Sequence, residues 1–331
     1  MQSKQANLEK KASNTKIDLK TIEWNKYMVY IVFVIVFLAF SIFLGNKGFL
    51  SSNNLLNILR QTSMISIMAV AGTFVLAAGQ IDLTVGAVAA MTAMCVSLIL
   101  QSTNSIILAL LVGLGFGVVS GAINGFLVTI LKIPAFLATL GMMQIIRGSA
   151  MWITNTAAVP IKNNQFNSVF GIGSVGGISV LILWTILFYI IGVFIFNKTP
   201  FGKHTLATGG NELSAKYSGI NTNLIKLKVF IMSGAFAAFA GILYAGRMQS
   251  GRYSFGDGDE MSVIAAVVLG GAAMNGGSGS VIGALVGSLL MGIIKNALIL
   301  AGLSSSQQTI VQGLIIVFAV ALSNLSSKKN N

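Results

Sequence analysis

About ten apolar runs, most of them long enough to cross a lipid bilayer, follow one another along this 331-residue sequence. A bilayer-spanning helix needs about 20 apolar residues, and backbone polar groups in hydrocarbon must bond to one another. We therefore expect an all-α polytopic membrane protein with about ten transmembrane helices. The expected spans lie near residues 27–44, 62–79, 83–100, 106–130, 135–154, 178–196, 226–247, 261–275, 279–300 and 307–325.

Charge is too scarce for a water-soluble protein of this length. Only 9% of the residues are charged, whereas a soluble domain carries roughly a quarter. The lipid bilayer must be the solvent for most of the chain. The acidic residues that remain after Glu23 are Asp82, Glu212, Asp257, Asp259 and Glu260.

The distribution of lysine and arginine predicts the orientation in the membrane. With a cytosolic N-terminus, fourteen positive charges fall on the inside and five on the outside, which satisfies the positive-inside rule. We expect a cytosolic tail at 1–26, a single transmembrane domain at 27–325 with a cytosolic loop at 197–226, and a cytosolic tail at 326–331. The net charge of +13 thus reflects topology, and we expect no nucleic-acid partner.

The chain offers few residues for catalysis or metal binding. Cys95 is the only cysteine and His204 the only histidine, which excludes a disulfide within the chain and histidine-rich metal sites. We expect no catalytic and no metal-binding residues.

A weak internal repeat links the two halves of the expected bundle. The segment 82–91 (DLTVGAVAAM) resembles 260–269 (EMSVIAAVVL), with an offset of five helices. An odd offset inverts the second copy, so helices two to five and seven to ten would form two inverted repeats. Inverted repeats interrupted at matching positions are typical of transporters and indicate a path at the repeat interface.

The stretch 207–221 predicts a short helix in the cytosolic loop. Asn211 is a good N-cap, Glu212 suits the positive helix start, and Gly219 suits a left-handed stop. Such a helix at 211–218 could transmit force from a soluble partner, or it could be an ordinary connector.

Polar residues within or beside the spans are candidates for a translocation path or a helix break. Asp82 would cap the third helix through backbone N–H groups near Thr84 and Val85, because its charge is costly in hydrocarbon. The neutral amides suit hydroxyl-rich solutes, but they suit hydrogen bonds between helices equally well. The candidates are Gly79, Asp82, Thr84, Gly86, Asn124, Gln144 and Asn296.

The expected external loop at 247–260 carries charges that could dock a binding protein, because complementary charges steer association. A solvated hairpin is the alternative. The charged residues are Arg247, Arg252, Asp257, Asp259 and Glu260.

Three motifs, which occur in the same order along the chain as in that family, resemble the permeases of ATP-binding cassette (ABC) importers of the ribose and simple-sugar type. They are the loop motif at 207–221, GQIDLTVG at 79–86, and IAAVVLGG at 264–271 with NGGSG at 275–279 and GLSSS at 302–306. The resemblance covers about residues 53–324. Gln80 stands where the family usually has glycine, Thr84 replaces serine, and Ser214 occupies a small-residue position.

The resemblance implies a type II importer architecture, with ATPase coupling through the loop motif. It also implies partner ATPase subunits that hold ATP and magnesium, an extracytoplasmic sugar-binding protein and a second permease copy. Consistently, the sequence has no phosphate-binding loop of its own. The coupling residues would be Gly209, Gly210, Asn211, Glu212, Leu213, Ser214, Ala215, Lys216, Ser218 and Gly219.

The sequence thus predicts a permease subunit in the cell membrane, not an enzyme, that carries ribose or a similar monosaccharide. A nucleoside or branched-chain amino-acid ABC permease is the alternative. An ion-coupled transporter would need ionisable groups at membrane depth, where the chain offers only Asp82, Arg147 and Lys295. A membrane enzyme is supported least.

Overall fold

The computed structural model describes residues 24–328, so most of the expected N-terminal tail and residues 329–331 lie outside it. Within this part, eight helices are long and apolar enough to cross a membrane. The all-α polytopic prediction is therefore confirmed. The eight are α2 (Trp24–Leu44), α3 (Ser52–Ala77), α4 (Val85–Thr103), α5 (Ile106–Thr129), α6 (Ala135–Ile153), α8 (Val180–Lys198), α11 (Thr222–Met248) and α13 (Val281–Leu300).

Two further helices occupy the remaining expected spans. Helix α14 (Ser305–Lys328) has 24 residues. Helix α12 (Asp259–Leu269) has only 11 residues, about 16 Å at 1.5 Å per residue, so the prediction of a spanning helix at 261–275 is wrong. Apolar residues continue beyond Leu269, but Gly271 takes a left-handed backbone with φ of 95°. The chain then forms a loop as far as Ser280.

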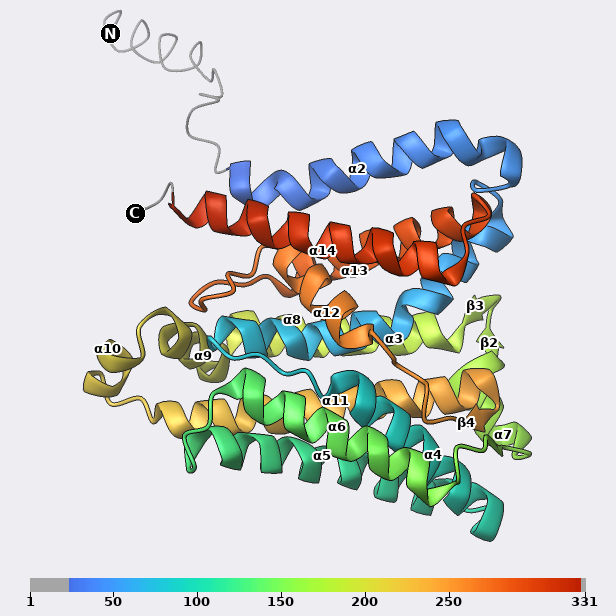
Figure 1. The fold of residues 1–331 in the computed structure, drawn as a ribbon, viewed down its shortest axis with the longest axis horizontal. Helices are drawn as coiled ribbons and strands as arrows, with labels where there is room; N and C mark the ends of the chain where they lie inside the picture. The colour runs from blue at the N-terminus through green and yellow to red at the C-terminus, as the bar shows by residue number, and fades with distance from the viewer. Residues whose placement is uncertain (1–23, 329–331) are drawn as a thin grey trace, which may run out of the picture.

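Short elements gather at the two ends of the bundle (Figure 1). Helices α9 (Pro200–Gly210) and α10 (Glu212–Tyr217) form one end, which we call the α10 end. The opposite end, the strand end, holds η1 (Gly45–Lys47), α7 (Asn164–Asn167) and the π-helical turn η2 (Ser168–Ile172). It also holds two antiparallel strand pairs: β1 (Val159–Pro160) with β4 (Ser250–Gly251), and β2 (Ser174–Val175) with β3 (Ile178–Ser179).

The two halves of the bundle are inverted relative to each other. Helix α3 runs toward the α10 end, whereas α11 runs away from it (Figure 1). Near the strand end the Arg247 guanidinium, in the last turn of α11, donates to the Arg60 carbonyl in α3. Each of these two helices packs against the second and third helices of the other half. Helix α3 packs against α12 and α13, and α11 packs against α4 and α5.

Glycines allow the closest of these contacts. A Cβ on Gly117 or Gly121 of α5 would overlap backbone atoms of α11, and a Cβ on Gly241 of α11 would overlap the backbone of α4 at Ala89. Small residues let membrane helices approach this closely. The glycines spaced four residues apart in α5 therefore serve packing within one chain.

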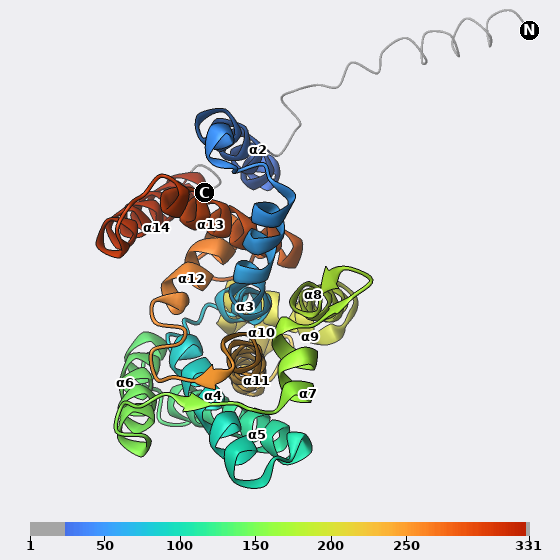
Figure 2. The ribbon, with the colours of Figure 1, turned by 90° about the vertical axis from the view of Figure 1, so that its right-hand side faces the viewer.

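The centre of the bundle is formed by α3, α4 and α11, which are mostly buried. Helices α2, α5, α6 and α8 lie around it (Figure 2), and fewer than a third of their residues are buried. An exposed apolar surface of this extent suits lipid rather than water.

Candidate functional site

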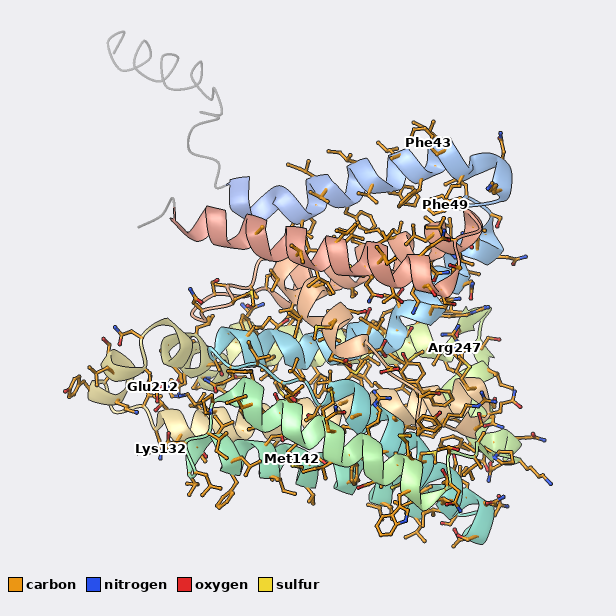
Figure 3. The ribbon with its side chains drawn as sticks, viewed as in Figure 1. Phe43, Phe49, Lys132, Met142, Glu212 and Arg247 are labelled. Carbon is orange, nitrogen blue, oxygen red and sulfur yellow. The ribbon has the colours of Figure 1, made fainter. Side chains whose placement is uncertain are left out.

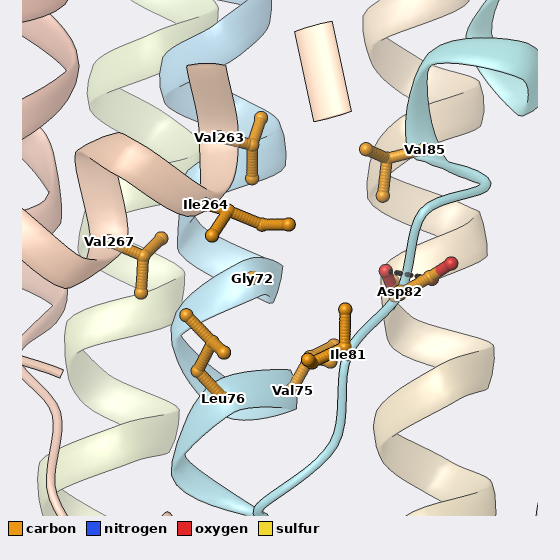
Figure 4. A pocket seen from close by; sticks show the side chains of 10 residues that line it. Gly72, Val75, Leu76, Ile81, Asp82, Val85, Val263, Ile264 and Val267 are labelled. Carbon is orange, nitrogen blue, oxygen red and sulfur yellow. Dashed lines mark hydrogen bonds between the residues drawn. The ribbon is translucent and has the colours of Figure 1, made fainter. Parts of the chain in front are cut away.

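Asp82 lies where the chain crosses from α3 to α4 in an extended segment (Figure 4). Its Oδ1 accepts hydrogen bonds from the Thr84 backbone N–H at 2.9 Å and from the Thr84 hydroxyl at 2.5 Å. Its Oδ2 accepts from the Ser233 hydroxyl of α11 at 2.7 Å. Asp82 thus bonds the Thr84 N–H, as expected, but it does not cap α4, because Thr84 is the N-cap residue and no side chain bonds the N–H groups of the first turn.

Asn124 of α5 extends this network, because its side-chain amide donates to the Thr84 hydroxyl at 2.9 Å. Asp82 is 6% exposed, and Thr84, Asn124 and Ser233 are 3% exposed or less. Three of these residues were candidates from the sequence. Ser233 was not, because nothing in the sequence distinguishes it from the other small residues of α11.

A small, mostly apolar pocket adjoins Asp82 (Figure 4). Its walls come from α3, from the segment between α3 and α4, from the first residue of α4, from α11 and from α12. Asp82 and Ser233 supply its only carboxylate and hydroxyl lining side chains. The lining residues are Gly72, Val75, Leu76, Ile81, Asp82, Val85, Ser233, Val263, Ile264 and Val267.

The backbone closes the strand-end side of this region. A Cβ on Gly86 would overlap the carbonyl oxygen of Gly256 and would lie 2.7 Å from Oε2 of Glu260. Gly86, in the first turn of α4, thus lies directly under the loop that leads into α12.

The 247–260 segment does not present all its charges outward, as docking would require. Asp259 and Glu260 are only 6% and 8% exposed, and Asp259 accepts a hydrogen bond from the Tyr244 hydroxyl at 2.5 Å. Asp257 is exposed and forms an ion pair with Arg147 at 3.6 Å. Arg252 is exposed, so surface docking can involve Arg252 and Asp257 but not the two buried acids.

Arg147 fastens this loop to α6. Its guanidinium donates to the Tyr253 carbonyl at 2.8 Å and to the Phe255 carbonyl at 3.5 Å, and it also faces Asp257. Only 15% of its side chain is exposed. Arg147 thus holds in place the loop that covers Glu260.

The short helix expected at 211–218 is present as α10. The Asn211 side chain caps it by accepting from the Ser214 N–H at 2.9 Å, and Gly219 follows with φ of 83°. Leu213 and Tyr217 are 61% and 85% exposed, while Ala215 is buried. Two apolar side chains therefore project from the α10 end.

Glu212 fastens α10 to the first turn of α11. It pairs with Lys226 at 2.6 Å and Lys216 at 2.9 Å, and it accepts from the Thr222 hydroxyl at 3.1 Å. Burial alone would raise the pKa of Glu212. The two lysines and Thr222 outweigh that effect and lower the pKa to about 2. Glu212 is therefore ionised at neutral pH and couples the two helices.

Gly209, ahead of α10, contacts the chain at the end of α3 and in the loop after α12. A Cβ on Gly209 would overlap the Ala77 carbonyl at the end of α3. That carbonyl accepts from the Gly277 N–H of the loop after α12 at 2.9 Å. Gly79, with φ of 69°, also faces the Gly209 backbone. The structure thus places the coupling candidate Gly209 beside the helix-break candidate Gly79.

Two sequence candidates lie elsewhere. Gln144 is exposed on α6. Asn296 of α13 exchanges two amide hydrogen bonds with Asn54 of α3, at 2.9 and 3.0 Å. This reciprocal pair joins two helices, the alternative that the sequence left open for such amides. Among the described residues, no three His, Cys, Asp or Glu side chains are grouped closely enough to hold a metal ion.

Comparison with known proteins assigns these features to a family. Residues 54–320 match the family described as branched-chain amino acid transport system / permease component. The chain belongs to this family. It is therefore a multi-pass membrane protein and a transporter component rather than an enzyme.

Curated relatives are similar over most of their length. The probable ABC transporter permease protein YphD of Escherichia coli is 38% identical over 93% of this chain and 92% of its own. The ribose import permease protein RbsC of Haemophilus influenzae is 36% identical over 97% and 99%. The L-arabinose transport system permease protein AraH of E. coli is 36% identical over 92% of both chains. No solved structure matches the chain.

Proposed function

We propose that this chain is the membrane-spanning permease subunit of an ABC importer that carries ribose or a similar monosaccharide. The observation that supports it most is the full-length similarity to relatives named as ribose and L-arabinose permeases. The Asp82 motif GQIDLTVG, which resembles that of simple-sugar permeases, favours the same substrate class.

The α10 end supports the partner assignment. Leu213 and Tyr217 project from a helix that Asn211 caps and that Glu212 fastens to α11. Exposed apolar side chains on a braced helix suit docking to a soluble subunit. That subunit would be the ATPase, which holds ATP and magnesium. A binding protein would deliver the sugar at the strand end, and a second permease copy would complete the pair.

The charge distribution supports a cytosolic α10 end. Lys132 lies at this end together with Glu212 and its lysine partners, whereas Arg247 lies at the opposite end (Figure 3). The ends of α2 and α14 nearest the termini also lie at the α10 end (Figure 1). By the positive-inside rule both termini would then be cytosolic.

Reconstitution tests the proposal. We would co-express the permease with the ATPase and the binding protein encoded beside it and measure uptake of labelled ribose and sugar-stimulated ATP hydrolysis in proteoliposomes. Both should appear, and vanadate should abolish uptake. Vanadate-insensitive uptake would refute the ABC assignment.

A matched pair of variants tests the role of α10. Replacing both Leu213 and Tyr217 with alanine should lower uptake and stimulated hydrolysis about tenfold, because a truncated pair of central contacts costs more than about 1.4 kcal/mol. Ile107→Ala is the control, since Ile107 is an exposed apolar residue of α5 near the strand end. Equal activity of the two variants would contradict the coupling role.

The same vesicles test the main alternative. The family description names branched-chain amino acids, so uptake of leucine, isoleucine and valine would be measured in parallel with ribose. Amino-acid uptake without sugar uptake would replace the sugar assignment and leave the ABC assignment intact.

A further inference from the structure

Asp82 and Glu260 occupy matching places in the two inverted halves. The segments 82–91 and 260–269 align residue by residue. Asp82 precedes α4 and Glu260 lies in the first turn of α12, the two helices that begin within the bundle (Figure 1). The position after next also matches. Thr84 accepts from the Asn124 amide, and Ser262 accepts from the Gln312 amide of α14.

The two carboxylates differ in their hydrogen bonds. Both oxygens of Asp82 accept hydroxyl or N–H donors. Glu260 is more than nine-tenths buried, yet its Oε2 has no hydrogen-bond partner among the described residues. A buried carboxylate oxygen without a donor is costly, so Glu260 retains a free acceptor in a dry place.

Glu260 lies beside the pocket of Figure 4. Val263, Ile264 and Val267 line that pocket from α12, and Glu260 precedes them by three, four and seven residues. This spacing places all four residues on one face of the helix. Oε2 also lies against Gly86, next to the pocket residue Val85. The free oxygen therefore adjoins the strand-end side of the pocket.

The nearby cation is occupied elsewhere. The Arg147 guanidinium donates to the Tyr253 and Phe255 carbonyls and pairs with Asp257. Above Oε2, the Gly256 backbone rests on Gly86 without an intervening side chain. Separation of these two glycines would expose Oε2 to whatever enters from the strand end.

We propose that Glu260 is a hydroxyl-binding residue of the transport path, whose Oε2 accepts a hydrogen bond from a neutral polyol when the Gly86–Gly256 contact opens. The inference rests on the proposed function and adds to it the residue and atom that recognise the sugar in the permease. A sugar hydroxyl donates one hydrogen bond and brings no charge, which fits a single unpaired acceptor in an apolar surrounding.

The test compares a sugar with analogues that each lack one hydroxyl. Uptake of ribose and of singly deoxygenated riboses would be measured in proteoliposomes holding the complete importer. The same binding protein serves every variant, so a change in the ribose-to-deoxyribose ratio reports on the permease. In E260Q this ratio should fall by up to about tenfold for at least one analogue, because the amide offers the hydroxyl a neutral acceptor or an N–H donor in place of a carboxylate oxygen.

Asp257→Asn is the matched control, because Asp257 is a carboxylate three residues away on the exposed side of the loop. Because Asp257 can take part in docking, its substitution can change the uptake of all sugars together, but the ribose-to-deoxyribose ratio should equal that of the unmodified importer. Glu260→Asp keeps the charge but withdraws it by one methylene, and its ratio should lie between those of the unmodified protein and E260Q. If the E260Q permease does not assemble with its partner subunits, the Glu260→Asp variant alone tests the proposal.

The outcomes separate the two proposals. An unmodified importer that moves no sugar defeats the proposed function. Robust sugar uptake with the same ratio in E260Q, E260D and the unmodified protein defeats only the hydroxyl contact. Uptake that depends on sodium in the unmodified protein but not in E260Q would assign Oε2 to a cation and would also overturn the inference.

Discussion

The start of α4 at Asp82 and the start of α12 at Glu260, which we call the two breaks, have matching sequences but differ in how many hydrogen bonds their carboxylates accept. In both, the hydroxyl two residues later accepts a hydrogen bond from a side-chain amide of another helix: Thr84 from Asn124, and Ser262 from Gln312. Asp82 is bonded through both oxygens, one of them to α11, whereas Glu260 keeps one oxygen free. The inverted repeat therefore reproduces backbone geometry, while single side chains decide which break is a fixed joint and which can accept a ligand.

The largest expected loss of stability comes from removing the hydrogen-bonded carboxylate of Asp82. Asp82→Ala leaves the Thr84 N–H and the Ser233 hydroxyl buried without an acceptor, which should cost about 3 kcal/mol of the free energy of unfolding. Glu260→Ala removes an oxygen that has no donor and should cost less than about 1 kcal/mol. Thermal unfolding in detergent measures both. A Glu260 variant as unstable as the Asp82 variant would contradict the comparison.

The contact that covers Glu260 gives the second effect. In Gly86→Ala the added Cβ would overlap the Gly256 carbonyl, and overpacking of this kind costs about 1–3 kcal/mol. We expect a lower unfolding temperature and impaired uptake. Gly115→Ala in α5 is the control, because a Cβ there meets nothing within 4 Å. Unimpaired uptake in Gly86→Ala would show that the two glycines need not stay in contact.

Ser233→Ala should have a smaller effect than Asp82→Ala. It removes one of the three hydrogen bonds to Asp82 and leaves the other two, both from Thr84. We expect a loss of about 1–2 kcal/mol in the same unfolding assay. A loss as large as that of Asp82→Ala would mean that the bond to α11, rather than the local Thr84 bonds, holds the break.

The smallest effect is expected at Glu212, a partly exposed carboxylate with which the buried Asp82 and Glu260 can be compared. The pKa of Glu212 is lowered from 4.5 to about 2, so its stabilising contribution is complete above about pH 4.5 and is lost as the pH falls toward 2. The stability difference between the unmodified protein and Glu212→Gln should shrink over that interval. Because 36% of the side chain is exposed, solvent screening should keep the difference below about 1 kcal/mol. A difference independent of pH would contradict the pairing.

Much of this fold could be predicted because lipid imposes simple rules. Long apolar runs gave the spanning helices, and the offset between 82–91 and 260–269 gave the inversion. The error at 261–275 arose because hydropathy does not register the left-handed glycine at Gly271, which follows the end of α12. Local capping rules likewise predicted α10 from Asn211 and Gly219.

The candidate site was only partly predictable, since its members come from distant segments. Asp82, Thr84 and Asn124 stood out as polar residues in apolar runs, but nothing local distinguishes Ser233 from the packing residues of α11. The burial of Asp259 and Glu260 was also hidden, because the sequence does not show that Arg147 of α6 draws the loop down over α12. Only the three-dimensional structure separates the exposed Asp257 from its buried neighbours.

Helix α11 contacts three of the acidic residues described above. Its first turns hold Glu212 through Lys226 and Thr222, its middle holds Asp82 through Ser233, and its last turns hold Asp259 through Tyr244. It runs unbroken for 27 residues, about 40 Å. Under the proposed function, a displacement that the ATPase imposes on α10 would therefore move α11 and reach both breaks in one step. The cytosolic and external sides of the permease would then change conformation together rather than one after the other.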